Sequence, residues 1–196
     1  MRIITGKAKG LSLKTPKGLL TRPTSDRIKE SLFSILNGII NFDDKIVLDL
    51  FAGTGALGLE AISRGSAQAV FVDSETINVI RDNVNRAHFN EQSEIIRGDV
   101  FKNIKKFADS QRQFDLIFCD PPYNKGLGQR ILDEIYKLNL LMPEGLLVIE
   151  HGADETMEIS SNLSVTPANF RNIRQIKYGH TTAIDIFKRN IDEIIS

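Results

Sequence analysis

The chain has 196 residues, of which 41% are hydrophobic, so it can bury a sizeable core and is not a disordered polypeptide. A single cysteine, Cys119, excludes an intrachain disulfide and a cysteine-only zinc site, which fits a reducing cytoplasm. No apolar run approaches the ~18 residues of a membrane helix, and the first ten residues lack the apolar core of a signal peptide. We therefore expect a cytoplasmic protein with one main domain.

The net charge is zero, but basic side chains gather at the N-terminus. Residues 1–30 carry eight basic and two acidic side chains, a net charge of +6, which leaves −6 for the rest of the chain. A basic segment on an acidic body favours a polyanionic partner, although a solvated basic surface is the alternative. The candidate contacts are Arg2, Lys7, Lys9, Lys14, Lys17, Arg22 and Arg27. For Arg22 and Arg27, which flank a helix cap, capping and solvation are the alternative role.

The N-terminal stretch is rich in Gly, Thr, Lys and Pro and predicts short strands around a glycine turn, followed by an extended segment. Thr24, Ser25 and Asp26 are good N-caps for a helix that begins there. The predicted inward face of this helix is Ile28, Leu32, Ile35 and Leu36. We interpret residues 1–24 as a basic hairpin or arm and residues 25–196 as the main domain.

From Lys45 onward, apolar strands alternate with glycine turns and amphipathic helices. Strands are predicted at residues 45–51, 69–73, 94–99, 115–120 and 145–151. Helices are predicted at residues 57–64 and 130–138, and a further helix after the second strand is predicted to have Ile77, Ile80, Val84 and Ala87 on one side. This order predicts an α/β fold with a mostly parallel sheet that is covered by helices on both faces. Residues 170–189 predict two more strands, an antiparallel hairpin at the sheet edge with its turn at 178–181, which makes seven strands.

Glycines follow the first of these strands in the segment DLFAGTGALG. Gly53, Gly55 and Gly58 fit the spacing G-x-G-x-x-G, which lets the backbone approach a ligand, although a tight turn explains the same residues. No Lys-Ser/Thr pair follows, so the loop is not a P-loop. Asp49, just before the loop, would repel a pyrophosphate and suits a ligand that carries a positive charge.

Acidic residues also end the next two strands. Asp73 lies eighteen residues after Gly55 and can accept hydrogen bonds from both hydroxyls of a ribose. Asp99 can accept from an adenine amino group. A ligand with a ribose, an adenine, a positive charge and no phosphate is S-adenosylmethionine (SAM), which we predict as the cofactor. Its predicted site residues are Asp49, Phe51, Ala52, Gly53, Thr54, Gly55, Asp73, Ser74, Asp99, Val100 and Asp120.

The fourth strand of the parallel part ends in the sequence DPPY, residues 120–123. Pro121 and Pro122 fix the backbone, because proline has a restricted φ and no N–H. The Asp120 carboxylate and the Pro121 carbonyl can then accept both hydrogens of an exocyclic amine and direct its lone pair toward the methyl donor. Tyr123 offers a face on which a flipped-out base can stack. These four residues are the predicted catalytic segment, and the mechanism needs no metal.

Together these motifs resemble a known family. VLDLFAGTGALGLEAISRG, FVD, RGD and DPPY, in this order, are similar to the Rossmann-like SAM-dependent amino-methyltransferases. RIITGKAKG, TRPTSDRIKESLF, FDLIFCDPPY and KYGHT narrow the resemblance, over nearly the whole chain, to the bacterial small-subunit ribosomal RNA guanine-N2 methyltransferases of the RsmD type. The resemblance implies methylation of a guanine amino group in ribosomal RNA, on an assembling small subunit, and we expect a monomer. Asp73 stands where the family often has glutamate, and Glu75 is an alternative ribose ligand.

Other functions use parts of this pattern. A nicotinamide-dependent oxidoreductase would explain the glycine loop and Asp73, but neither Asp49 nor DPPY. A silent nucleic-acid-binding module would not need DPPY, whereas DNA adenine and protein amide methyltransferases share it. The three histidines are interpreted as a surface residue (His88), a loop residue near the site (His151) and a turn residue that is structural or faces RNA (His180). None has metal-ligand spacing, so no metal is predicted.

Overall fold

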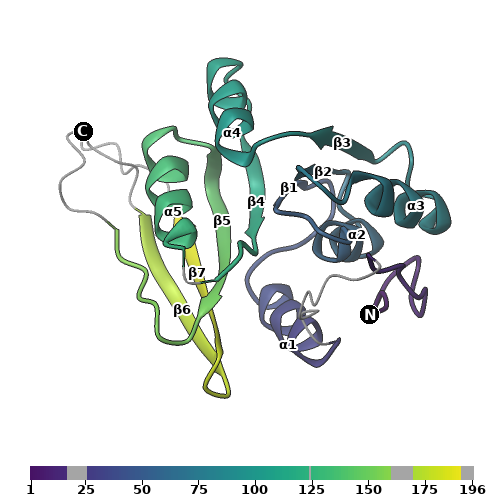
Figure 1. Ribbon diagram of the computed structural model, residues 1–196, viewed down its shortest axis with the longest axis horizontal. Helices are drawn as coiled ribbons and strands as arrows, with labels where there is room; N and C mark the ends of the chain where they lie inside the picture. The colour runs from purple at the N-terminus through teal and green to yellow at the C-terminus, as the bar shows by residue number, and fades with distance from the viewer. Residues whose placement is uncertain (17–25, 124, 160–169, 191–196) are drawn as a thin grey trace. The chain divides into compact units, whose positions relative to one another are not determined.

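The computed structural model describes residues 1–16, 26–123, 125–159 and 170–190. It forms two units, Met1–Gly98 and Asp99–Ser196. The described residues contain five helices and seven strands, labelled in Figure 1. Within this part of the chain, no helix has both the length and the apolar character needed to span a membrane. The predicted contacts Lys17 and Arg22, and the predicted caps Thr24 and Ser25, lie outside the described residues.

The first unit contains α1 (Asp26–Asn37), β1 (Ile46–Leu50), α2 (Ala56–Ser63), β2 (Gln68–Asp73), α3 (Ile77–Ala87) and β3 (Ser93–Arg97). Its strands form a parallel sheet in the order β3-β2-β1. The central residues of β1 and β2 are buried, as expected for parallel strands that are covered on both faces. The strands predicted for this region are confirmed, with ends that differ by two residues or fewer.

The helix α1 buries a different face from the one that its apolar pattern predicts. The buried residues are Lys29, Leu32, Phe33 and Leu36, in place of the predicted Ile28, Leu32, Ile35 and Leu36. A buried lysine is costly unless it is paired. Lys29 Nζ lies 3.2 Å from Glu60 Oε2 and donates to the Arg2 carbonyl at 2.6 Å. These polar partners hold Lys29 inward, which apolar periodicity alone does not indicate.

The N-terminal segment, residues 1–16, folds back on itself as predicted, but it forms one isolated antiparallel bridge in place of a hairpin of two strands. The segment is fixed to α2, because the Glu60 carboxylate accepts the backbone N–H groups of Ile4 at 2.7 Å and Thr5 at 3.0 Å. Asn83 of α3 holds the segment further along. These described residues are therefore anchored to the first unit and are not a free arm.

The second unit contains α4 (Val100–Asp109), β4 (Phe114–Cys119), α5 (Leu127–Lys137), β5 (Leu141–Gly152), β6 (Phe170–Tyr178) and β7 (Thr182–Arg189). Its strands lie in the order β4-β5-β7-β6, with β4 and β5 parallel and the other neighbours antiparallel. Figure 1 shows α5 against β5 and the hairpin β6–β7 at the edge. The predicted α/β class and the predicted C-terminal hairpin are confirmed.

The helix α4 is missing from the sequence prediction, which passes directly from the third strand to the fourth. Its buried side chains include Val100, Ile104 and Phe107, which recur at helical spacing. The pattern was therefore present in the sequence. Three lysines between these positions, and Asp109 after them, give the segment a polar appearance, although they only form the outer face of an amphipathic helix.

Candidate functional site

The loop that follows β1 has an unusual backbone, because three of its residues have left-handed φ angles. The angle is 56° at Phe51, 57° at Gly53 and 77° at Gly55. Gly58, in the first turn of α2, is required for packing, since a Cβ there would lie 2.4 Å from Cε1 of Phe71. The glycines therefore make a tight turn and a close helix–strand contact possible, and the loop presents its backbone at the end of β1.

Asp49 is a buried carboxylate at the end of β1, with 3% of the residue exposed. Its Oδ2 accepts a hydrogen bond from the Gly58 backbone N–H at 2.9 Å. Burial raises the pKa of Asp49 to about 8, the Gly58 hydrogen bond opposes this shift, and the charge of Asp73 adds to it. None of the described residues donates a hydrogen bond to Oδ1. A cation at this oxygen would offset the cost of burying the charge. The positively charged ligand stays a prediction from the sequence.

Asp73, at the end of β2, shapes the backbone around it. Its Oδ2 accepts from the Gly53 N–H at 3.0 Å, and its Oδ1 accepts from the N–H groups of Glu75 at 2.7 Å and Thr76 at 2.8 Å. A carboxylate offers about four acceptor positions, so about one remains for a ligand. The neighbouring Ser74 is exposed. Asp73 thus fixes the loop glycine and the entry to α3 in one arrangement.

Thr54 links the loop to the N-terminal segment. Its carbonyl accepts from Asn83 Nδ2 at 2.9 Å, and its hydroxyl donates to Met1 Sδ at 3.5 Å. The same Asn83 side chain accepts from the Lys14 N–H at 2.7 Å and donates to the Lys14 carbonyl at 3.0 Å. Ala52, two residues before Thr54, is buried. The N-terminal segment therefore supports the loop, a connection that the sequence did not indicate.

Asp99 has a structural role that the sequence prediction missed together with α4. It is the N-cap of that helix, and its Oδ1 accepts from the Lys102 N–H at 2.9 Å. Its carbonyl accepts from Asn103 Nδ2 at 2.8 Å. The Asp99 side chain is exposed and the next residue, Val100, is buried. Capping explains the aspartate without a ligand, so its contact with an adenine stays a prediction.

The segment DPPY begins one residue after β4 ends at Cys119. Asp120 and Tyr123 are half-buried, Pro121 is buried and Pro122 is exposed. Two partially exposed side chains thus flank a backbone that the prolines restrict. This arrangement is compatible with the predicted orientation of an amine by the Asp120 carboxylate and the Pro121 carbonyl.

The hydroxyl of Tyr123 is held by two residues that the sequence prediction did not include. It donates to Glu150 Oε1 in β5 and also hydrogen-bonds Thr182 at the start of β7. Burial and then the Glu150 carboxylate raise the pKa of Tyr123 far above its ordinary value, so the hydroxyl stays protonated and donates. Glu150 and Thr182 are 7% and 3% exposed. An acid within the apolar strand GLLVIEH was the signal that could have indicated this partner.

His151 is not the loop residue that the sequence predicted, because it lies buried within β5. Its Nε2 is 2.8 Å from Asp185 Oδ2 in β7, and its Nδ1 is 2.8 Å from the Gly152 carbonyl. Burial opposes a charge on this ring, but the hydrogen bonds to Asp185 and Gly152 outweigh it and raise the pKa of His151. The pair joins two strands of the sheet. His88 and His180 are exposed, the first at the end of α3 and the second in the hairpin turn.

The described residues contain no group of three or more His, Cys, Asp or Glu side chains that could hold a metal ion.

The predicted polyanion contacts that lie within the described residues are all exposed: Arg2, Lys7, Lys9, Lys14 and Arg27. Arg2 and Lys14 have acidic partners, Asp26 at 3.8 Å and Asp82 at 2.8 Å. Lys29, which contributes to the charge of residues 1–30, is buried beside Glu60 and is not exposed to a polyanion.

Comparison with known proteins connects these features to a family. The family described as conserved hypothetical protein 95 matches residues 1–187. This chain belongs to that family. The relative named ribosomal RNA small subunit methyltransferase D, from Escherichia coli K12, is 30% identical over 193 residues, which cover 96% of this chain and 90% of that protein. The family that the motifs resembled is thus confirmed.

Solved structures confirm the fold. The hypothetical protein TTHA0928 of Thermus thermophilus superposes with a TM-score of 0.79 at 28% identity, over 95% of this chain and 98% of its own. An RNA methyltransferase from Salinibacter ruber, solved in complex with S-adenosyl-L-homocysteine, has a TM-score of 0.61 at 13% identity, over 89% and 99% of the two chains. The second likeness concerns the fold alone, and it agrees with the predicted Rossmann-like arrangement.

Proposed function

We propose that this protein transfers a methyl group from SAM to the exocyclic 2-amino group of a guanine in small-subunit ribosomal RNA. One observation carries the proposal: the DPPY segment, with its tyrosine anchored by Glu150, occurs in a chain that covers 90% of a relative named ribosomal RNA small subunit methyltransferase D. The guanine and its 2-amino group come from the resemblance of the N-terminal motifs to the RsmD type.

The residues of the first unit fit the chemistry of SAM. SAM supplies a methyl group on a positively charged sulfur and also carries an ammonium group and a ribose. Asp49 binds the ammonium group, because one oxygen of its buried carboxylate has no donor among the described residues and a cation there stabilises the charged form that burial disfavours. Asp73 accepts one ribose hydroxyl with the acceptor position that its backbone partners leave. The loop glycines leave space for the rest of the ligand.

The residues of the second unit orient the amine. The Asp120 carboxylate and the Pro121 carbonyl each accept one N–H of the guanine amino group, so the nitrogen lone pair is directed at the methyl carbon. The new C–N bond forms as the C–S bond breaks, and the sulfur leaves with the bonding electron pair. The methylated nitrogen then loses one proton to Asp120 or to water. Tyr123 holds the base by stacking, with its ring fixed through its hydroxyl.

The proposal is tested by incubating the protein with methyl-labelled SAM and three acceptors. These are free small-subunit rRNA, purified small ribosomal subunits lacking the modification, and DNA. The expected result is label in N2-methylguanosine after nucleoside digestion of the RNA. Asp120→Asn should lose most of the transfer while binding S-adenosylhomocysteine within a few-fold of the original protein. Label in methyladenine of DNA would show a DNA adenine enzyme instead.

A nicotinamide-dependent oxidoreductase is separated from this proposal by ligand binding. Thermal unfolding should shift upward with S-adenosylhomocysteine and should not shift with NAD. The RNA contact of the N-terminal segment belongs to the same proposal. Lys7 and Lys9 are exposed, and among the described residues neither has an acidic partner, so both are available to phosphates.

A further inference from the structure

We propose that one face of strand β6, which carries Arg171 and Arg174, is a second surface that contacts the sugar-phosphate backbone of RNA. The inference rests on the RNA substrate proposed above and adds a surface in the second unit to the N-terminal segment of the first. Overall charge conceals this surface, because the chain after residue 30 has a net charge of −6. Residues 170–189 nevertheless carry five basic side chains and one acid, Asp185, which is buried.

A β-bulge brings both arginines to the same face of the sheet. Arg171 is opposite Lys188 and Arg174 is opposite Ile186, and the register shifts by one at Ile173. Lys188 and Ile186 are two residues apart on β7, so their side chains share a face. Side chains directly opposite each other across an antiparallel pair share a face as well. Without the extra residue, Arg174 would point to the other face.

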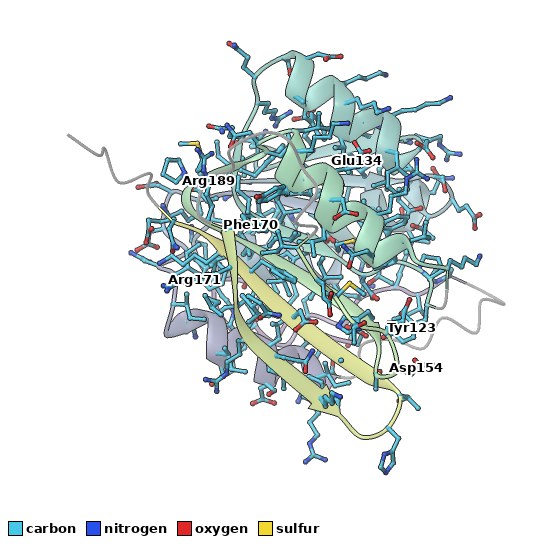
Figure 2. All side chains as sticks on the ribbon, turned by 90° about the vertical axis from the view of Figure 1, so that its left-hand side faces the viewer. Tyr123, Glu134, Asp154, Phe170, Arg171 and Arg189 are labelled. Atoms are coloured by element: carbon cyan, nitrogen blue, oxygen red, sulfur yellow. The ribbon has the colours of Figure 1, made fainter. Side chains whose placement is uncertain are left out.

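The other face of β6 is occupied by contacts within the protein. The Phe170 ring packs edge-on against Tyr136 of α5, with 5.6 Å between the ring centroids. Figure 2 shows Phe170 toward α5 and Arg171 on the other side of the strand. Asn172 Nδ2 donates to Asp185 Oδ1 at 2.9 Å on the same face as Phe170. Phe170 and Asn172 on this face thus have partners within the protein, whereas both arginines stand on the opposite face and are exposed.

The face with the arginines continues to the catalytic segment. Tyr178, at the far end of β6, is paired with Thr182, which hydrogen-bonds the Tyr123 hydroxyl. Arg174 precedes Tyr178 by four residues, a distance of about 13 Å along a strand. An RNA chain whose target base stacks on Tyr123 can follow β6 from this point, with its phosphates next to Arg174 and then Arg171.

The state of the two arginines favours a phosphate ligand. Both are exposed, and no acid in the described part of the chain lies within ion-pair distance of either one. Arginine binds phosphate through two parallel hydrogen bonds. Charged residues on an edge strand also prevent pairing between sheets of different molecules, which is the competing explanation. Lys177 can distinguish phosphate binding from protection of the sheet edge, because it is exposed on β6 but lies on the other face, opposite Ala183.

The experiment compares the double variant Arg171→Gln/Arg174→Gln with the matched control Lys177→Gln. Binding to a transcript of small-subunit rRNA is measured over a range of salt concentrations, and calorimetry with S-adenosylhomocysteine reports whether each variant is folded. We expect the double variant to bind RNA about tenfold more weakly or worse. The slope of log affinity against log salt should flatten by about 2, because two phosphate contacts are lost. Lys177→Gln should resemble the original protein in RNA binding, and binding of S-adenosylhomocysteine should stay unchanged in both variants.

Three results would overturn the inference. The double variant could bind RNA with unchanged affinity and salt slope, or Lys177→Gln could weaken binding equally, which would indicate a general charge effect. The double variant could also self-associate in gel filtration while its monomer binds RNA normally, which would show that the arginines only protect the edge. In each case the original protein would still methylate the free rRNA or the small ribosomal subunits. Absence of methylation and of RNA binding in the original protein would instead contradict the proposed function.

Discussion

We expect Tyr123→Phe to lower kcat/KM for methyl transfer by about 10- to 150-fold, although the ring that stacks on the base is kept. The lost hydroxyl donates to Glu150, which is 7% exposed, and hydrogen-bonds Thr182. A hydrogen bond to a charged group contributes about 1.5–3 kcal/mol, and each 1.4 kcal/mol is a factor of ten. If the transfer requires the anchored orientation of the ring, this free energy is lost from the transition state.

The assay uses small ribosomal subunits and labelled SAM, with calorimetry on S-adenosylhomocysteine as the control. Binding of this product should change little, because Tyr123 acts on the acceptor. Tyr123→Ala should be slower than Tyr123→Phe, since it also loses base stacking, worth about 1–3 kcal/mol. Glu150→Gln should cost less than either, because the amide oxygen can still accept from the tyrosine.

A double-mutant cycle decides whether the two side chains act together. In the Tyr123→Phe background, Glu150→Gln should have almost no further effect on kcat/KM, because its partner is already gone. Equal effects of Glu150→Gln with and without the tyrosine hydroxyl would show that the two residues act independently. That outcome, or full activity of Tyr123→Phe, would refute the anchoring role.

The remaining predictions concern the donor and the basic segment. Burial raises the pKa of Asp49 to about 8. Between about pH 4 and pH 8 the folded chain therefore keeps a proton on Asp49 that the unfolded chain has released. The stability of the SAM-free protein consequently falls as the pH rises from about 4 to about 8. Asp49→Asn should remove this fall in urea unfolding and stabilise the SAM-free protein at pH 7 by at most about 4 kcal/mol, while weakening SAM binding; parallel pH profiles would contradict the role of burial. Asp73→Ala should weaken S-adenosylhomocysteine binding by about 5- to 150-fold in calorimetry, and unchanged affinity in a folded variant would contradict the ribose contact. Lys7→Gln/Lys9→Gln should flatten the slope of log RNA affinity against log salt by about 2, and an unchanged slope would show that the two lysines are only solvated surface residues. Substitution is preferable to deletion of the segment, because deletion would remove the backbone partners of the buried Glu60.

Periodicity alone was sufficient for most of the fold. Strands that are covered on both faces consist of continuous apolar runs, and glycines mark their exits, so the parallel strands and the edge hairpin were predicted correctly. Periodicity failed where polar groups are buried. Lys29 lies on the buried face of α1 because it forms an ion pair with Glu60, and these two residues are 31 positions apart in the sequence. No local pattern contains a partner at that distance.

The candidate site shows the same limit. The acids and the DPPY segment could be predicted, because strand ends and proline pairs are local features. Glu150 and Thr182 could not, since they meet Tyr123 only after β5 and β7 have paired. Asp99 was predicted as a ligand because it follows the third strand, and the helix α4 gives its carboxylate a capping role as well. A single residue can therefore satisfy two explanations, which only ligand binding can separate.

Both surfaces proposed to meet RNA are fixed before RNA arrives, by different means. Glu60 holds the N-terminal segment through two backbone N–H groups, and its own charge is balanced by Lys29 and Arg64 at 3.2 and 2.9 Å. On β6 the extra residue Ile173 sets the face of the strand on which the arginine side chains stand. A surface that is already ordered loses little conformational entropy on binding, so more of each phosphate contact appears as affinity. Glu60→Gln should therefore weaken RNA binding through a looser segment, although residue 60 itself is fully buried and cannot touch RNA.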